Sequence, residues 1–141
     1  MNALGIHLLI EMQDCSPISL DDIDHVRNAM LTAARETGVT VLGDKFHKFS
    51  PQGVTGVVAI AESHLTIHTW PEYKYAAADV FTCGDSFDPR IAAAVLVREL
   101  NCKKPQITEI KRGLSIGFRP SKTQMQTQVP VLAASKGYRG E

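Results

Sequence analysis

Four segments with strong β-strand character follow one another in the middle of the sequence, and only short breakers separate them. The breakers are SPQG at 50–53 and PEYK at 71–74. Because neither is long enough to hold a helix, consecutive strands must pair as antiparallel neighbours. The segment 54–62 is apolar on both faces, which predicts a central strand. The four predicted strands cover residues 39–49, 54–62, 64–70 and 77–82.

Two segments with helical periodicity flank these strands. Ser19, with Asp22 three residues later, has the spacing of a capping box and predicts the start of the first helix, and Gly38 predicts its end. Asp88-Pro89 predicts the start of the second helix, because proline favours the first helical position. The second helix is expected to end near Asn101.

Strands at 4–12 and 106–112 complete the pattern. This order of elements predicts an α+β fold, a two-layer sandwich of an antiparallel sheet with two helices on one face. Residues 1–114 are expected to form a single domain. Residues 115–141 are polar and without periodicity, so a partly disordered C-terminal tail is expected there. The other sheet face needs a cover, and a second copy of the chain is the simplest one.

Composition favours a soluble protein that acts on a small molecule. The 141 residues are 44% hydrophobic and 21% charged, as in ordinary globular domains. Fifteen basic residues balance fifteen acidic ones, so no net charge attracts nucleic acid or an anionic membrane. No apolar run is long enough to span a membrane, and the N-terminus lacks the basic start of a signal peptide. We therefore expect a cytoplasmic location.

The segment ESHLTIHTWPEY (62–73) concentrates reactive side chains. On a helix, His64 and His68 together with Glu72 would suggest a metal site. The β-branched residues between the histidines and the closing Pro71 favour a strand instead. On a strand the two histidines lie roughly 13 Å apart, so we predict no metal here.

Ser63 and His68 raise the possibility of a serine-histidine-acid triad. The GxSxG motif is absent, because Ser63 lies in AESHL. In an unbroken strand, residues 63 and 68 point to opposite faces, so they can cooperate only across a kink near Ser63. Considered alone, Ser63 is better explained as a hairpin turn residue, and each histidine as a half-buried structural side chain.

The cysteines and two aromatic residues also allow two interpretations. Three widely spaced cysteines are typical of reduced thiols, and Cys83 is either a packing residue or a reactive thiol. Phe49 and Trp70 are either core residues or a stacking surface for a flat or cationic ligand.

The segments ESHLTIHTWPEY (62–73) and YAAADVFTCGD (75–85) closely resemble the bacterial and archaeal S-adenosylmethionine decarboxylase proenzymes, which depend on a pyruvoyl group. The resemblance extends from about Leu4 to Arg112 and includes FHKFSPQGVTGVVAI (46–60). It implies that the chain cuts itself between Glu62 and Ser63, and that Ser63 becomes the covalent pyruvoyl cofactor, which forms a Schiff base with the substrate amine.

The resemblance also implies a role for individual residues. His68 corresponds to the proton acceptor in processing and Cys83 to the proton donor in decarboxylation. Thr55 occupies the position of a hydroxyl that assists processing, where the family usually has serine. Threonine keeps the oxygen but adds a stiffening methyl group, so slower processing is expected.

Substrate contacts follow from the chemistry of S-adenosylmethionine. Its adenine and sulfonium call for aromatic faces, and its ribose calls for a carboxylate, so we expect Phe49, Trp70 and Glu72 to bind it. Lys74 departs from the glycine that is more usual after PEY, and a cation pointing into the site would disfavour a sulfonium.

The resemblance implies a lyase that supplies the aminopropyl donor for spermidine synthesis and works as a homodimer of processed αβ protomers, with no nucleic acid or membrane partner. Two alternatives stay open at this point. One is a paralogue that decarboxylates arginine or ornithine by the same chemistry. The other is an unprocessed, non-catalytic binding partner, although the presence of Ser63, His68 and Cys83 together argues against it.

Overall fold

The computed structural model describes residues 3–83, 85 and 87–114, so the predicted tail at 115–141 lies outside the described residues. The elements follow one another as a first strand, two helices, three strands, a 3-10 turn, a strand, a helix and a last strand. Their bounds are β1 (Gly5–Gln13), α1 (Pro17–Asp21), α2 (Ile23–Glu36), β2 (Thr40–Lys48), β3 (Val54–Ala61), β4 (Ser63–Trp70), η1 (Pro71–Tyr73), β5 (Tyr75–Cys83), α3 (Pro89–Glu99) and β6 (Lys104–Arg112).

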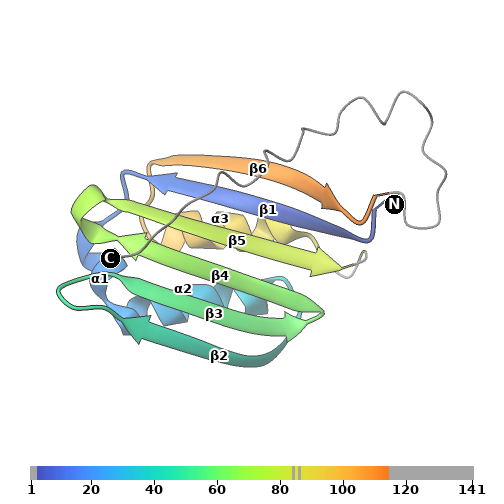
Figure 1. Cartoon of the computed structure of the whole chain (residues 1–141), viewed down its shortest axis with the longest axis horizontal. Helices are drawn as coiled ribbons and strands as arrows, with labels where there is room; N and C mark the ends of the chain where they lie inside the picture. The colour runs from blue at the N-terminus through green and yellow to red at the C-terminus, as the bar shows by residue number, and fades with distance from the viewer. Residues whose placement is uncertain (1–2, 84, 86, 115–141) are drawn as a thin grey trace, which may run out of the picture.

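In the described part of the chain the strands form one six-stranded sheet in the order β2-β3-β4-β5-β1-β6. Each neighbouring pair is antiparallel. Helices α2 and α3 lie behind the sheet on the same face (Figure 1). The predicted α+β sandwich, with an antiparallel sheet and its two longer helices on one face, is confirmed. The segment 54–62 forms β3, which is an interior strand but not a central one, because β4 and β5 occupy the middle of the sheet.

The first helical segment differs from the prediction, because a break at Asp22 divides it into two helices. Ser16, and not Ser19, caps the short α1 by accepting a hydrogen bond from the Ser19 amide. Asp22 has an extended backbone conformation, and its carboxylate accepts hydrogen bonds from the amides of Asp24 and His25 at the start of α2. The predicted capping box is therefore wrong. Asp22 is itself the N-cap residue, for which aspartate is among the preferred types.

The second helix begins as predicted. Asp88 accepts a hydrogen bond from the Arg90 amide, and Pro89 is the first helical residue. The helix ends at Glu99, two residues before the predicted end at Asn101.

Alternation along the strands places one face of the sheet against the helices. The buried side chains of β4, for example, are Leu65, Ile67 and Thr69, and those of β1 include Leu8 and Ile10. Together with the inner faces of α2 and α3 they form the core. Burying this apolar area is the main source of stability.

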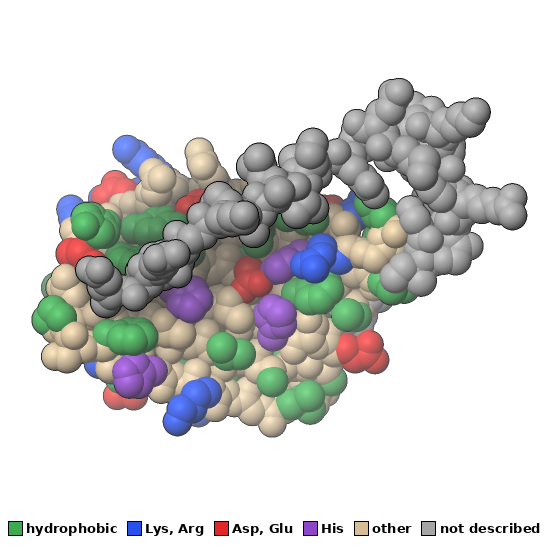
Figure 2. Space-filling model, in the orientation of Figure 1, with side chains coloured by type: hydrophobic (Ala, Val, Ile, Leu, Met, Phe, Trp, Pro, Cys, Tyr) green, Lys and Arg blue, Asp and Glu red, His purple; other side chains and the backbone are tan. Residues whose placement is uncertain are grey.

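The opposite face, which we call the open face, carries no helix among the described residues and is the side seen in Figures 1 and 2. It carries Leu9, Val57 and Trp70, with exposed fractions of 37%, 41% and 38%. Histidine and acidic side chains lie among these apolar residues (Figure 2). Apolar surface of this kind often marks a contact with another molecule. No helix in the described ranges has the length and apolar character needed to cross a membrane.

Candidate active site

A cavity of about 320 Å³ lies at the end of β4 where the strand runs into η1. The residues that the sequence predicts as substrate contacts line this cavity together with two of the predicted processing residues. Its lining comprises Phe49, Gln52, Gly53, Thr55, His68, Thr69, Trp70 and Glu72.

Thr55 and His68 are directly opposite each other on β3 and β4. The Thr55 hydroxyl and Nδ1 of His68 are 2.9 Å apart, within hydrogen-bond distance. A hydroxyl in this position orients the imidazole and stabilises one of its tautomers. The structure therefore brings together the two residues expected to assist processing, on an exposed part of the open face.

Aromatic rings form one wall of the same region. Trp70 stacks on Tyr75, with ring centroids 5.4 Å apart, and the ring of His68 lies 6.3 Å from that of Trp70. The Tyr75 hydroxyl donates a hydrogen bond to Glu11, and burial followed by this contact raises the pKa of Tyr75 to about 12. Tyr75 therefore stays neutral at physiological pH and holds Trp70 in place.

Ser63 and Cys83 lie at the opposite end of the sheet. Ser63 is the first residue of β4 and pairs with Thr82 of β5, next to Cys83. The backbone φ of Ser63 is +134°, a value that L-residues with a side chain rarely adopt and that costs energy. The backbone thus departs from regular strand geometry at Ser63, although this does not bring Ser63 close to His68 within the chain. The residue that the sequence predicts as the cleavage point is thus held in a strained conformation.

Thr82 adds a second unusual feature at this end. Its side chain is buried, and within the described part of the chain its hydroxyl has no hydrogen-bond partner. A buried hydroxyl without a partner is costly, and such groups are uncommon in native structures. Thr82 pairs directly with Ser63, so the residue that carries this hydroxyl is next to the predicted cleavage point.

The two groups of predicted residues do not meet within one chain. At about 3.3 Å per strand residue, positions 63 and 68 of β4 are roughly 16 Å apart. A triad of Ser63 and His68 inside one chain is therefore ruled out. A metal site of His64, His68 and Glu72 is not formed either, because His64 lies at the Ser63 end and the other two line the cavity.

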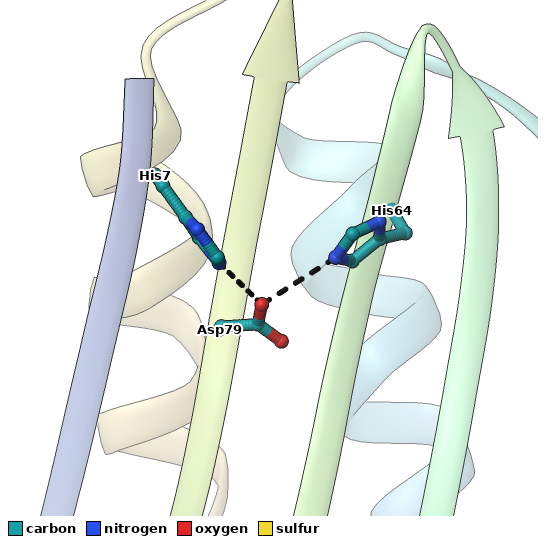
Figure 3. Close-up of side chains that lie close together, drawn as sticks. All are labelled: His7, His64 and Asp79. Atoms are coloured by element: carbon teal, nitrogen blue, oxygen red, sulfur yellow. Dashed lines mark hydrogen bonds and ion pairs between the residues drawn. The ribbon is translucent and has the colours of Figure 1, made fainter. Parts of the chain in front are cut away.

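His64 instead joins two residues that the sequence argument missed, His7 of β1 and Asp79 of β5 (Figure 3). The Asp79 carboxylate accepts hydrogen bonds from Thr66 and from Nε2 of His7, and its Oδ2 is 3.4 Å from Nε2 of His64. Burial acts to raise the pKa of Asp79, but the Thr66 and His7 contacts outweigh it, so the pKa is lowered. Asp79 is therefore an anion under ordinary conditions.

Lys74 does not line the cavity that holds Trp70 and Glu72. It adopts a left-handed conformation, with φ +52°, directly after η1. Its side chain lines a separate groove with Tyr73, Tyr75 and Lys104. Within the chain, the charge of Lys74 therefore lies outside the predicted substrate site.

A family model described as S-adenosylmethionine decarboxylase matches residues 6–113. The chain belongs to the S-adenosylmethionine decarboxylase family.

Members of the S-adenosylmethionine decarboxylase family are close to this chain in sequence. The S-adenosylmethionine decarboxylase proenzyme of Thermodesulfovibrio yellowstonii is 53% identical over 114 residues, which cover 81% of this chain and 84% of that protein. The proenzyme of Clostridium tetani is 51% identical over 114 residues, covering 81% of this chain and 90% of its own length.

The fold agrees with this family as well. The crystal structure of the adenosylmethionine decarboxylase from Aquifex aeolicus is 30% identical to this chain and superposes with a TM-score of 0.77. The match covers 86% of this chain and all of that one. Both the sequence motifs and the sheet-and-helix architecture are thus those of an S-adenosylmethionine decarboxylase.

Proposed function

We propose that this chain is a self-processing, pyruvoyl-dependent S-adenosylmethionine decarboxylase of the cytoplasm, which makes the aminopropyl donor for spermidine synthesis. The observation that carries the proposal is that the residues expected for this chemistry occupy two defined places at the two ends of one sheet. Ser63 and Cys83 lie at one end, and Thr55 and His68 lie in the cavity at the other.

The residues around position 63 fit a pyruvoyl group made from the chain itself. Ser63 has a strained backbone, and the neighbouring Thr82 hydroxyl has no hydrogen-bond partner in the described part of the chain. Cleavage would relieve the strain and give this hydroxyl a new polar neighbour. When present, a pyruvoyl group supplies an electron-withdrawing carbonyl that makes loss of carbon dioxide from an amino acid feasible.

Cleavage itself needs only groups of the protein. The Ser63 hydroxyl attacks the carbonyl carbon of Glu62, and the peptide bond between these residues becomes an ester. His68 then accepts the α-proton of residue 63, so the Glu62 carboxylate is eliminated, the chain divides and position 63 becomes dehydroalanine. Water adds to the imine form of this residue and ammonia leaves, which gives the pyruvoyl group. The Thr55 hydroxyl keeps the His68 ring in the orientation needed for this transfer.

A second copy of the chain would bring the two ends together. If two open faces pack against each other about a two-fold axis, the His68 cavity of each copy can face Ser63 of the other, since such an interface is reciprocal. The uncovered Leu9 and Val57 on this face are the kind of surface that such an interface buries. We therefore assign Thr55 and His68 to the Ser63 of the partner copy, in a homodimer of processed protomers.

The substrate would lie between these groups. Phe49 and Trp70 present aromatic surface to adenine and to the positive sulfonium, and Glu72 can accept hydrogen bonds from the ribose hydroxyls. The Cys83 thiol holds the proton that the product carbon receives after carbon dioxide leaves. Cys83 is partly exposed at the end of β5, next to the residue that pairs with Ser63.

The test measures processing and substrate choice separately. Intact-mass analysis should show two fragments that divide between Glu62 and Ser63, and the Ser63→Ala chain should stay whole. The processed protein should release carbon dioxide from S-adenosylmethionine but not from arginine or ornithine. Turnover of arginine or ornithine alone would overturn the substrate assignment. A chain that stays whole after long incubation would overturn the enzyme assignment in favour of a non-catalytic binding partner.

A further inference from the structure

Three side chains on adjacent strands of the sheet converge on the open face. His7 of β1, Asp79 of β5 and His64 of β4 each direct one polar atom to the same point, and these three atoms lie within 4.8 Å of one another (Figure 3). The side chains of His7 and Asp79 are only 14% and 18% exposed, and that of His64 is 38% exposed. The cluster is thus a half-buried group shared by three adjacent strands of the sheet.

The donor set of this cluster suits a transition-metal ion. Two imidazole nitrogens and one carboxylate oxygen, with one position left for water, form a common set for Zn²⁺. Two ligands of a tetrahedral Zn²⁺ are separated by about 3.3 Å when each bond is 2.0–2.1 Å long. Nε2 of His64 and Oδ2 of Asp79 are already 3.4 Å apart. The closer contact between His7 and Asp79 has to open, and the nitrogens of the two imidazoles already lie within 4.8 Å of each other.

The remaining contacts of the carboxylate support the same interpretation. The Thr66 hydroxyl donates to the other oxygen, Oδ1, which leaves Oδ2 directed towards the two imidazoles. Residues that hydrogen-bond a ligand in this way fix its orientation and strengthen metal binding. Thr66 is directly opposite Asp79 on the neighbouring strand, so the sheet itself keeps the carboxylate in place.

One contact opposes a metal ion. Nη1 of Arg112 donates to Nδ1 of His7 at a distance of 3.0 Å, so Nδ1 holds a lone pair and Nε2 carries the proton. A metal bound at Nε2 requires the other tautomer, with the proton on Nδ1. Arg112 must then release His7. It can stay nearby, because its guanidinium lies 5.3 Å from the centre of the Phe81 ring.

We propose that His7, His64 and Asp79 form a binding site for a divalent transition-metal ion such as Zn²⁺, and that Arg112 limits the affinity of this site by holding His7 in the competing tautomer. The bound ion joins three neighbouring strands at the end of the sheet where Ser63 and Cys83 lie. The proposal does not depend on the decarboxylase activity, because it concerns binding of the metal alone.

The experiment compares Zn²⁺ binding by the full chain and by single variants. Each protein is stripped with a chelator, refolded with or without Zn²⁺ and dialysed. Its metal content is then measured by mass spectrometry and its affinity by titration calorimetry. Refolding in the presence of Zn²⁺ gives the ion access to the site even if a second copy later covers it. His25→Gln is the matched control, because His25 lies on the helix layer and contacts the Glu99 carbonyl.

The full chain and the His25→Gln control should bind one Zn²⁺ per chain. Asp79→Asn and His64→Gln should each weaken binding by about tenfold or more, since each loses one ligand. Folding of both ligand variants is checked by circular dichroism. If one of them folds poorly, Zn²⁺ binding by the other variant still tests the proposal. Arg112→Gln should bind Zn²⁺ more tightly than the full chain. Mg²⁺ should not compete, because it prefers oxygen ligands.

Two results would overturn the proposal. If the full chain holds no more Zn²⁺ than the Asp79→Asn and His64→Gln variants, the cluster is only a hydrogen-bond network. If Arg112→Gln binds Zn²⁺ more weakly than the full chain, Arg112 supports the site and does not compete with the ion.

Discussion

Thr55 is the residue of β3 that pairs directly with His68, and the contact between its hydroxyl and Nδ1 of His68 orients the imidazole. Threonine and serine can both supply this oxygen, but threonine has fewer accessible side-chain rotamers on a strand. The added methyl group therefore restricts rotation of the Thr55 side chain, but the hydroxyl can still form the same hydrogen bond with His68. The effect on processing depends on the hydroxyl itself.

Replacing Thr55 separates these two contributions. Thr55→Val keeps the shape but removes the oxygen, so self-cleavage should slow by about tenfold or more, in line with the loss of a group that positions a base. Thr55→Ser should cleave at least as fast as the natural chain. A time course of fragment formation by intact mass measures both rates. Equal rates for Thr55→Val and the natural chain would show that the hydroxyl has no part in processing.

Some residues of the candidate site could be predicted from the sequence, and others could not. Phe49, Trp70 and Glu72 were expected from the chemistry of the substrate, and all three line one cavity. His7 and Asp79 were missed because 72 residues of sequence separate them. Their contact depends on β1 and β5 being neighbours, and alternation within a strand carries no information about which strands pair.

At the level of elements, the division between α1 and α2 illustrates a limit of pattern recognition. Ser19 and Asp22 have the spacing of a capping box, yet Asp22 is the cap and Ser19 lies inside the preceding helix. The apolar periodicity runs on from one helix to the next, so it does not reveal the break. The strands were easier to predict, because glycine, proline and polar turns separate them clearly.

The role of Asp22 as a cap can be measured directly. Asp22→Ala should lower the free energy of unfolding by about 1 kcal/mol, because the amides of Asp24 and His25 lose their acceptor. Asp24→Ala is the control. It removes a charge from the same helix turn but no cap, and should cost only about 0.3 kcal/mol because the Asp24 side chain is exposed. Urea unfolding followed by circular dichroism gives both values. Asp22→Ala with the stability of the natural chain would contradict the assignment.

At the scale of the molecule, the antiparallel arrangement separates the two halves of the proposed site. Ser63 begins β4 and Cys83 ends β5, so both lie at one end of the sheet, whereas Thr55 and His68 lie towards the other. This separation is not evident from the motif at 62–73, because Ser63 and His68 are close together in the sequence. Only the extended conformation of β4 makes clear how far apart they are.

A shared site predicts that two defective chains can repair each other. Ser63→Ala and His68→Ala should each remain whole when produced alone. When they are produced together with different tags, the His68→Ala chain should be cut, because it keeps Ser63 and receives His68 from its partner. Intact mass identifies which tagged chain is cleaved.

The control for this experiment replaces the donor chain. A partner that carries both Ser63→Ala and His68→Ala should leave the His68→Ala chain uncut. If the His68→Ala chain is cut without any partner, His68 is not the base. If it stays whole beside the Ser63→Ala chain, the two ends do not act across a pair of copies.

Under the shared-site proposal, the distance between Ser63 and His68 along β4 also determines how the rate of self-cleavage depends on protein concentration. A newly folded single chain has the serine but no base within reach, so cleavage becomes second order and its rate at low concentration rises with the square of the amount of protein. Dilute chains stay intact for longer. The reactive carbonyl is then generated only inside a pair of chains that already encloses it, and a solitary chain does not expose it to the many free amines of a cell.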